Sequence, residues 1–494
     1  MDGTYGISKS RYCRGFQCPK MLWLESNKPE LSQGEISDTI LANGKLVGDL
    51  AQNYFGECEI VEFDYEKSNM VLRTAQLMDA GAENIAEASF SYDGLYCAVD
   101  ILHKDEDGWD IVEVKSSTHI APIYIEDMAF QLYVLEQCGV NVKRVYNMHL
   151  DNTYVRHGEL DLQGLFALED CTGDVKLRAF DVADNIKSIR EYMCQSEEPA
   201  KDIDICCDSP YECSFKNYCW RNIPKPSVFD ISRLKAETKY DLYHKGIVSF
   251  DDVLDHQIKL SAKQILQVQT AAEHLPDRID ENAIIEFLNT LTYPIYHLDF
   301  ETFQQAVPEF EGGTPYAQIP FQYSLHIEYR DGHLEHKEFL AKEGTDPRRD
   351  LAESLCNDIP MGVCSLAYNM AFERTVILKL AETYPDLADH LIDIRENMHD
   401  LMIPFSKGDY YCEAMQGSYS IKYVLPALYP DDPELDYHNL EDVHNGSEAS
   451  AAFATMADHT PEEIEKLRAN LLKYCGLDTY AMVKVLAKLR EIVE

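Results

Sequence analysis

The stretch YPIYHLDFETF, residues 293–303, is an apolar run that contains two acids two residues apart, and such a run predicts a β-strand. Side chains two residues apart on a strand point to the same face, about 6.7 Å from each other. Asp299 and Glu301 therefore share one face of the predicted strand. Two carboxylates side by side in an apolar strand repel each other unless a cation lies between them, so the pattern indicates a divalent metal site. A solvent-exposed edge strand is the alternative interpretation.

Similar patterns divide the chain into three blocks. Residues 1–222 mix predicted strands with helices and end at the two prolines of CWRNIPKPSV. Residues 223–290 have a helical pattern in which Gly246 separates two helices and Ser249 is placed to cap the second. Residues 291–494 alternate strands with helices, which is typical of an α/β domain. We expect two α/β domains joined by a helical connector, although such a connector can also dock a nucleic-acid backbone.

The composition indicates where such a protein works. No apolar run in the 494 residues reaches the roughly eighteen residues that a membrane span needs, and the first residues lack an apolar leader. We therefore expect a cytoplasmic protein that does not contact a membrane. In a reducing compartment, its fifteen cysteines are expected to be free thiols or metal ligands rather than disulfides.

The net charge of −42 argues against a protein that coats duplex nucleic acid through bulk electrostatics. Any contact with nucleic acid must then be local. The segment SKSRYCRGFQCPK is one candidate, because cations there alternate with aromatic rings on which bases can stack: Lys9, Arg11, Tyr12, Arg14, Phe16 and Lys20. An exposed basic turn explains the segment equally well.

A second group of acids lies in GLYCAVDILHKDEDGWDIVEVKSS, residues 94–117, which predicts two strands joined by an Asp107-Gly108 turn. We expect Asp100 to close the first strand, and Glu113 and Lys115 to share a face of the second. Two acids and a lysine at a hairpin can hold Mg²⁺ and help to activate a water molecule. A surface salt bridge is the alternative for Glu113 and Lys115.

Cysteines flank this first block. Cys207, Cys213 and Cys219 are evenly spaced in CCDSPYECSFKNYCW, Cys206 precedes the first of them, and Cys18 lies far upstream. Thiolates gathered from both ends of a domain suit an iron-sulfur cluster or a Zn²⁺ site. Buried cysteines that serve only in packing are the alternative.

Further acids follow the 293–303 strand. Asn369, Phe372 and Glu373 lie where an apolar strand passes into a helix, and Tyr474 and Asp478 lie four residues apart on one helix face. Together with Asp299 and Glu301, these acids can hold two Mg²⁺ or Mn²⁺ ions about 4 Å apart for phosphodiester cleavage, with Tyr474 orienting the water. Asp400 is a fallback acid.

The strand-strand-helix order of the first block, with Gln131 and Tyr133 on the helix, resembles the PD-(D/E)XK nucleases of the RecB-like branch. In that branch an upstream helix often carries a histidine metal ligand, and this chain has Gly48 there. The cysteines resemble those of iron-sulfur RecB-type nucleases, including CRISPR-associated ones. That resemblance implies a 4Fe-4S cluster on Cys18, Cys207, Cys213 and Cys219, with Cys13 and Cys206 as adjacent alternatives.

The order D-x-E, N-x-x-F-[D/E], Y-x-x-x-D resembles the DEDD exonucleases of the DnaQ-like, RNase H-like fold, in the tyrosine subclass. Glu373 stands where that family usually has aspartate. The whole chain resembles bacterial proteins that end in a domain of unknown function. These resemblances imply a metal-dependent nuclease that acts on single-stranded DNA or RNA, with a 3′-to-5′ exonuclease site in residues 291–494. The alternatives are a nucleic-acid-binding adaptor in which one of the two centres has decayed, with the N-terminal centre as the first candidate, and a regulatory protein without catalysis that is held together by zinc.

Overall fold

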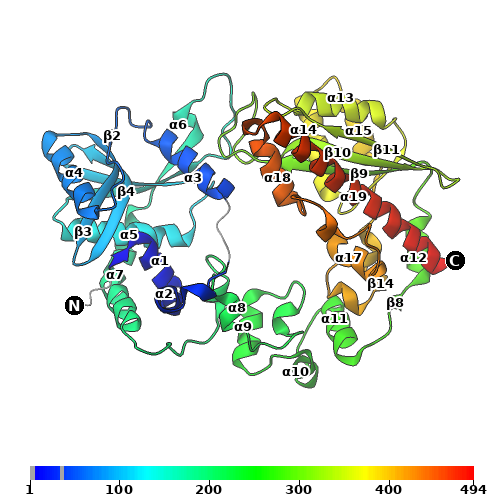
Figure 1. Ribbon diagram of the computed structural model, residues 1–494, viewed down its shortest axis with the longest axis horizontal. Coiled ribbons are helices and arrows are strands. Elements are labelled where there is room, and N and C mark those ends of the chain that lie inside the picture. Colours follow the sequence, from blue (N-terminus) through cyan, green and yellow to red (C-terminus); the bar gives the residue numbers. More distant parts are fainter. Residues whose placement is uncertain (1–5, 34–37) are drawn as a thin grey trace. The chain divides into compact units, whose positions relative to one another are not determined.

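The computed structural model describes residues 6–33 and 38–494, which form a mixed α/β structure (Figure 1). The chain divides into two compact units. Unit 1 comprises Met1–Asn222 and Gln305–Tyr316, and unit 2 comprises Ile223–Gln304 and Ala317–Glu494. Within the described residues, no helix is both long and apolar enough to cross a membrane.

Unit 1 is built on a seven-stranded mixed sheet of order β2-β3-β4-β5-β6-β7, with β1 paired beside β4. The pairs β3–β4, β4–β5 and β6–β7 are antiparallel, whereas β1–β4, β2–β3 and β5–β6 are parallel. The strands are β1 (Ile7–Ser8), β2 (Glu59–Ile60), β3 (Asn84–Tyr92), β4 (Leu95–Asp105), β5 (Gly108–Lys115), β6 (Val142–Leu150) and β7 (Phe166–Asp170).

The predicted hairpin is confirmed as β4 and β5, since Asp105 pairs with Gly108 across the turn. One detail of the prediction is wrong: Asp100 lies in the middle of β4, which continues for five residues to Asp105. The polar HKD stretch that suggested an end of the strand instead pairs with the start of β5.

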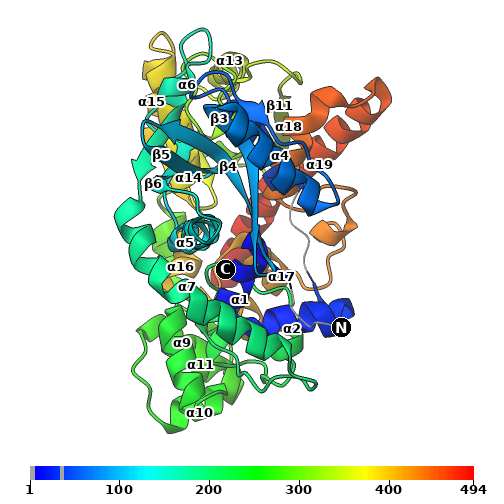
Figure 2. The same ribbon diagram turned by 90° about the vertical axis from the view of Figure 1, so that its left-hand side faces the viewer.

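Helix α5 connects the parallel strands β5 and β6 and lies beside the sheet, as Figure 2 shows. Its apolar side chains share one core with α1, α2, α7 and the strands. The helices of unit 1 are α1 (Lys9–Gln17), α2 (Pro19–Asn27), α3 (Asp38–Ala51), α4 (Lys67–Ala80), α5 (Pro122–Gln137), α6 (Leu162–Leu165), α7 (Thr172–Met193) and α8 (Lys216–Cys219).

The segment Gln305–Tyr316 belongs to unit 1 although unit 2 precedes and follows it in the chain. Ala306 and Val307 are buried in an apolar cluster with residues of α3, β5 and β6. The Arg156 guanidinium donates to the carbonyl oxygen of Pro308 at 2.8 Å, and the Tyr316 hydroxyl donates to the carbonyl oxygen of Ser116. The segment is therefore held by both apolar and polar contacts.

Unit 2 contains a five-stranded sheet of order β11-β10-β9-β12-β13, in which β9–β10 and β10–β11 are antiparallel and β9–β12 and β12–β13 are parallel. A short pair, β8–β14, lies apart from it. The strands are β8 (Arg278–Ile279), β9 (Ile295–Phe303), β10 (Ile319–Glu328), β11 (Leu334–Leu340), β12 (Cys364–Ala367), β13 (Met398–Asp400) and β14 (Tyr410–Tyr411). The predicted strand is thus confirmed as β9, which is central, so the edge-strand alternative is wrong.

The two faces of this sheet differ in chemistry. Tyr296, Leu298 and Phe300 of β9 pack in an apolar core with α13, α14 and α15. The intervening residues of β9 and β10 point to the opposite face, along which α19 runs (Figure 1). That face is polar: Gln322 donates to the carbonyl oxygen of Leu471, and Ser324 is hydrogen-bonded to Thr479.

The remaining helices of unit 2 include those of the predicted connector. Ser249 caps α10 as predicted, since its hydroxyl accepts from the Asp252 amide at 3.1 Å while Asp252 accepts from the Ser249 amide at 2.8 Å. The helices are α9 (Ala236–His244), α10 (Phe250–Asp255), α11 (Ala262–Glu273), α12 (Glu281–Leu288), α13 (Arg348–Asp358), α14 (Ala371–Thr383), α15 (Ala388–Glu396), α16 (Ile403–Lys407), α17 (Ile421–Leu428), α18 (Gly446–Thr455) and α19 (Pro461–Val493).

Candidate functional site

Four predicted acids of unit 2 come together between β9, α14 and α19. Asp299 and Glu301 extend from β9 toward α19, Glu373 lies in the first turn of α14, and Asp478 lies on α19. Glu301, Glu373 and Asp478 are each less than a tenth exposed. We call these four residues the C-terminal centre.

The pKa values of this centre show how closely the carboxylates interact. Burial, and then the charge of Asp478, raises the pKa of both Asp299 and Glu301 well above the usual range. Burial also raises the pKa of Glu373 to about 8 and that of Asp478 to about 6. Lys422, just after the start of α17, is the nearby cation that opposes these shifts at Glu301 and Asp478.

The donor set of the C-terminal centre fits a divalent cation. Hard carboxylate oxygens are the ligands that Mg²⁺ and Mn²⁺ prefer. Glu373 Oε2 is buried and, among the described residues, has no hydrogen-bond partner. A buried carboxylate oxygen without a partner costs about 1–3 kcal/mol or more, and a bound cation removes that cost.

A backbone turn positions Glu373. Asn369 follows β12 with a φ of 70°, in the left-handed region, and α14 begins two residues later. The Asp400 carboxylate fixes this turn by accepting from the Asn369 amide and the Met402 amide, each at 2.9 Å. Asp400 therefore supports the turn that positions Glu373.

Two tyrosines lie against Asp478. Tyr474, predicted as the water-orienting residue, is buried one helical turn before it on α19. The Tyr437 hydroxyl donates to Asp478 Oδ1 at 2.7 Å, and the hydrogen bonds of Tyr437 and Tyr474 both oppose the rise in the pKa of Asp478. Sequence reasoning missed Tyr437, because a single tyrosine in the acidic 431–442 loop has no recognisable pattern.

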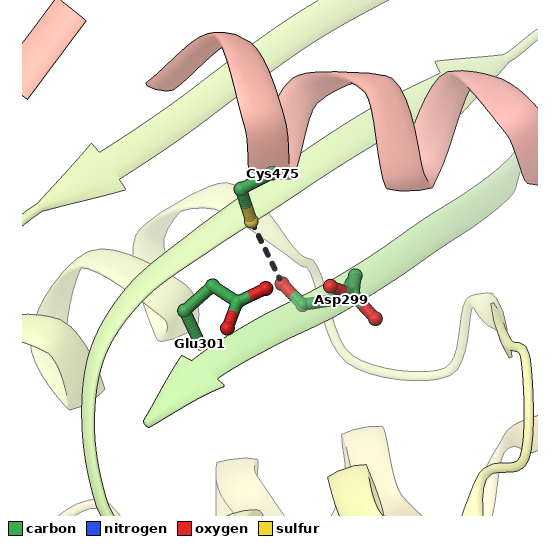
Figure 3. A group of neighbouring side chains, drawn as sticks. All are labelled: Asp299, Glu301 and Cys475. Carbon is green, nitrogen blue, oxygen red and sulfur yellow. Dashed lines mark hydrogen bonds between the residues drawn. The ribbon is translucent and has the colours of Figure 1, made fainter. Parts of the chain in front are cut away.

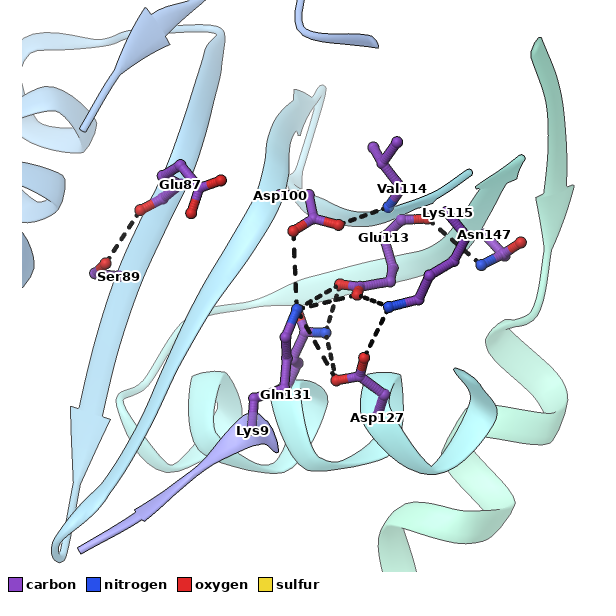
Figure 4. Close-up of polar contacts among 10 residues, drawn as sticks. All are labelled: Lys9, Glu87, Ser89, Asp100, Glu113, Val114, Lys115, Asp127, Gln131 and Asn147. Carbon is purple, nitrogen blue, oxygen red and sulfur yellow. Dashed lines mark hydrogen bonds and ion pairs between the residues drawn. The ribbon is translucent and has the colours of Figure 1, made fainter. Parts of the chain in front are cut away.

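The predicted acids and lysine of unit 1 also come together, in what we call the N-terminal centre (Figure 4). Glu113 is fully buried. It accepts from Lys115 and, at 2.7 Å, from the Gln131 amide of α5. Asp100 accepts from the Val114 amide at 2.7 Å. Glu113 and Lys115 do form the ion pair of the alternative interpretation, but Glu113 is buried and the pair belongs to this group of charges rather than to the open surface.

Sequence reasoning missed two members of the N-terminal centre, Lys9 and Asp127. Lys9, the first residue of α1, donates to both carboxylate oxygens of Glu113 at 3.0 and 3.1 Å, and its Nζ lies 3.8 Å from Asp100. Asp127 of α5 accepts from Lys115 at 3.0 Å. The sequence alone shows that Asp127 lies one helical turn before Gln131, so this acid could have been predicted. The position of Lys9 depends on the tertiary fold.

Charges in the N-terminal centre are largely compensated. Three carboxylates face two ammonium groups, which leaves one negative charge when all are ionised. Burial opposes ionisation of Glu113, but Lys115 and Lys9 outweigh it and hold the pKa of Glu113 well below the usual range. Burial, and then the charge of Glu113, raises the pKa of Asp100 to about 7. Lys9 therefore sits where a metal between Asp100 and Glu113 would lie, so the fit to a cation is poorer than in unit 2.

The basic segment predicted to bind nucleic acid does not form one exposed patch. Lys9 belongs to the N-terminal centre and Tyr12 is fully buried against Phe130. Arg14 and Lys20 form ion pairs with different partners, Glu25 and Glu198, each at 2.9 Å. The segment forms α1 and the start of α2, and the helical period of 3.6 residues turns its cations and rings to different faces.

Five cysteines line one small cavity in unit 1: Cys18, Cys206, Cys207, Cys213 and Cys219. Hydrogen bonds from Cys206 lower the pKa of both Cys18 and Cys207 to about 6. Burial raises the pKa of Cys213 to about 11 and also raises that of Cys219. The fit of the four predicted ligands to a metal or cluster therefore depends on the gathering of the thiols in one cavity rather than on their ionisation. Cys13 does not line this cavity. It lies close enough to Asp127 and Lys115 for their charges to act on its pKa, so its role as an adjacent alternative ligand is wrong.

Comparison with known proteins gives one match. A family model described as a domain of unknown function, DUF2779, matches residues 296–420. The matched stretch contains Asp299, Glu301 and Glu373, and it ends before Tyr474 and Asp478. No curated protein matches the chain.

Proposed function

We propose that the chain is a metal-dependent nuclease of single-stranded DNA or RNA, in which unit 2 is a DnaQ-like 3′-to-5′ exonuclease. The observation that carries this proposal is the convergence of four acids, three of them buried and Asp299 half-buried, from three separate elements, β9, α14 and α19. The D-x-E, Glu373 and Y-x-x-x-D motifs are 72 or more residues apart in sequence, so their meeting in one centre supports the DEDD resemblance.

The residues of the C-terminal centre suit phosphodiester hydrolysis. Two divalent ions held by Asp299, Glu301, Glu373 and Asp478 would activate water and stabilise the leaving oxygen. The Tyr474 hydroxyl would orient the attacking water. Lys422, whose charge already acts on Glu301 and Asp478, would meet the phosphate and offset part of the negative charge of substrate and acids together.

For unit 1 we propose a RecB-like PD-(D/E)XK domain that carries a 4Fe-4S cluster on Cys18, Cys207, Cys213 and Cys219. The gathering of these thiols in one cavity supports a bound metal centre, and Zn²⁺ on the same thiols is the alternative to the cluster.

The C-terminal activity is tested with a 3′-labelled single-stranded oligonucleotide and Mn²⁺, comparing Glu301→Gln with Glu382→Gln. Glu382 is an exposed acid of the same unit that pairs with Lys379. We expect the Glu301 variant to release mononucleotides at least about a hundredfold more slowly, because charge stabilisation of the transition state is lost. The Glu382 variant should match the parent. Equal rates for both variants, or products that shorten only from the 5′ end, would overturn the assignment.

One observation favours a second function for unit 1, binding without cleavage. Lys9 supplies the charge that a metal would otherwise supply to Glu113 and Asp100. If unit 1 only binds, Asp100→Asn should leave all cleavage intact while Glu301→Gln removes it. Loss of endonucleolytic products in Asp100→Asn alone would instead establish the N-terminal centre as catalytic.

A further inference from the structure

A cysteine sulfur lies within the C-terminal centre. Cys475 Sγ, a carboxylate oxygen of Asp299 and one of Glu301 all lie within 4.8 Å of one another (Figure 3). Cys475 is fully buried on the face of α19 that meets β9, and its thiol donates weakly to the Asp299 carbonyl oxygen at 3.9 Å. The thiol therefore points into the polar face of the sheet, where the acids lie.

A packing role alone does not account for a thiol at this position. The neighbouring side chains on β9 are the carboxylates of Asp299 and Glu301, each with an oxygen within 4.8 Å of the sulfur. An alanine or valine would fill the space without placing a titratable group beside two acids. Nearby, the buried Glu373 Oε2 has no hydrogen-bond partner among the described residues, and its carboxylate acts on Asp299. The four acids of the centre therefore outnumber Lys422, the cation whose charge acts on Glu301 and Asp478.

We propose that Cys475, Asp299 and Glu301 form a binding site for a thiophilic divalent ion, of which Zn²⁺ is the type. The ligands of a tetrahedral Zn²⁺ ion, one sulfur and two oxygens, lie about 3.6 Å apart, so small side-chain shifts close the site. On binding, the thiol proton leaves to solvent and the thiolate takes its place on the ion. The soft sulfur favours Zn²⁺, Co²⁺ or Cd²⁺ over Mg²⁺.

This site uses two acids of the proposed exonuclease, so any effect of the bound ion on cleavage rests on the proposed function. Binding of the ion to Cys475, Asp299 and Glu301 does not depend on that function. An ion held by Cys475 occupies the oxygens of Asp299 and Glu301 that the Mg²⁺ or Mn²⁺ form requires. Zn²⁺ then acts as an inhibitor that competes with the hard ion. Cys475 is in this sense a specificity-determining residue for the metal.

The test uses the full-length chain with its cysteine cavity already loaded under anaerobic conditions, titrated with Co²⁺. A Co²⁺–thiolate charge-transfer band in the near ultraviolet should appear with one equivalent bound. Cys475→Ser should abolish that band, and Cys364→Ser, a buried cysteine of the same unit, should retain it. Asp299→Asn keeps every cysteine and should weaken Co²⁺ binding about tenfold or more, which keeps the test valid if the serine variant unfolds. The same band in parent and Cys475→Ser would overturn the site.

Inhibition is measured separately, as the Zn²⁺ concentration that halves the Mg²⁺-dependent rate of each protein relative to its own uninhibited rate. We expect this concentration to rise about tenfold or more in Cys475→Ser and to stay unchanged in Cys364→Ser. A Cys475-dependent band without any Mg²⁺-dependent cleavage would overturn the proposed nuclease function and support the metal site. Cleavage with equal Zn²⁺ inhibition of parent and Cys475→Ser would support the nuclease function and overturn the role of Cys475 in inhibition.

Discussion

Replacing Lys9 by methionine tests whether this residue is the internal cation of the N-terminal centre. Methionine keeps the length of the side chain and removes the ammonium that donates to both oxygens of Glu113 at 3.0 and 3.1 Å. Glu113 is 0% exposed and the Lys9 side chain 21%, so the pair is largely withdrawn from water. Removing one partner of a buried ion pair costs about 3–5 kcal/mol. Lys115 and Gln131 remain hydrogen-bonded to Glu113 in the variant. We therefore expect a loss of stability of about 3 kcal/mol, at the lower end of that range.

The assay is amide hydrogen exchange of peptides from β5 and α5, which reports the local opening free energy of unit 1 rather than of the whole chain. Lys45→Met is the control, because Lys45 forms an exposed i,i+4 pair with Asp49 that is worth about 0.3–0.5 kcal/mol. Adding Mn²⁺ at a hundred times its Kd should restore about 2.7 kcal/mol in Lys9→Met, since the ion takes the place of the ammonium. Equal losses in the two variants, or weaker Mn²⁺ binding after Lys9 is removed, would refute this reasoning.

Three further predictions concern other parts of the molecule. Tyr437→Phe removes a hydrogen bond that opposes the rise in the pKa of Asp478, so the Mn²⁺ concentration needed for half-maximal cleavage near neutral pH should rise; an unchanged Mn²⁺ requirement would separate Asp478 from metal binding. Cys206→Ala removes the hydrogen bonds to Cys18 and Cys207 and should raise their pKa from about 6, seen as slower alkylation of the metal-free protein near neutral pH. Burial, then the charges of His336 and His297, lowers the pKa of His326 to about 3. The unfolded imidazole, with a pKa of about 6.5, binds protons that the folded one does not, so unit 2 should lose stability as the pH falls from about 6.5 toward 3. His326→Gln should flatten that loss in acid unfolding curves.

Sequence patterns were sufficient where the information is local. The pattern of residues 293–303 predicted β9 and the shared face of Asp299 and Glu301. The four-residue spacing of Tyr474 and Asp478 predicted that they share a face of α19. The same patterns predicted the hairpin and the Ser249 cap. Each of these depends on backbone periodicity or on hydrogen bonds within a few residues.

Features that depend on distant parts of the chain were beyond such patterns. Lys9 and Glu113 are 104 residues apart, and nothing near Lys9 distinguishes it from the other cations of a basic segment. Cys475 looks like one more apolar residue of α19, because only the position of β9 reveals its acidic neighbours. Cys13 and Cys18 are close in sequence, yet α1 places Cys13 near the N-terminal centre and not in the cysteine cavity.

The segment Gln305–Tyr316 has a practical consequence for anyone who wishes to dissect the protein. The chain passes between the two units three times, after Asn222, after Gln304 and after Tyr316, so no single cut separates them. A fragment that starts at residue 223 would carry the buried Ala306 and Val307 without the cluster that covers them. It would expose apolar surface only a few residues from Glu301. Truncated proteins that lose activity would therefore say little about which centre cuts, and point variants in the intact chain are the sounder route.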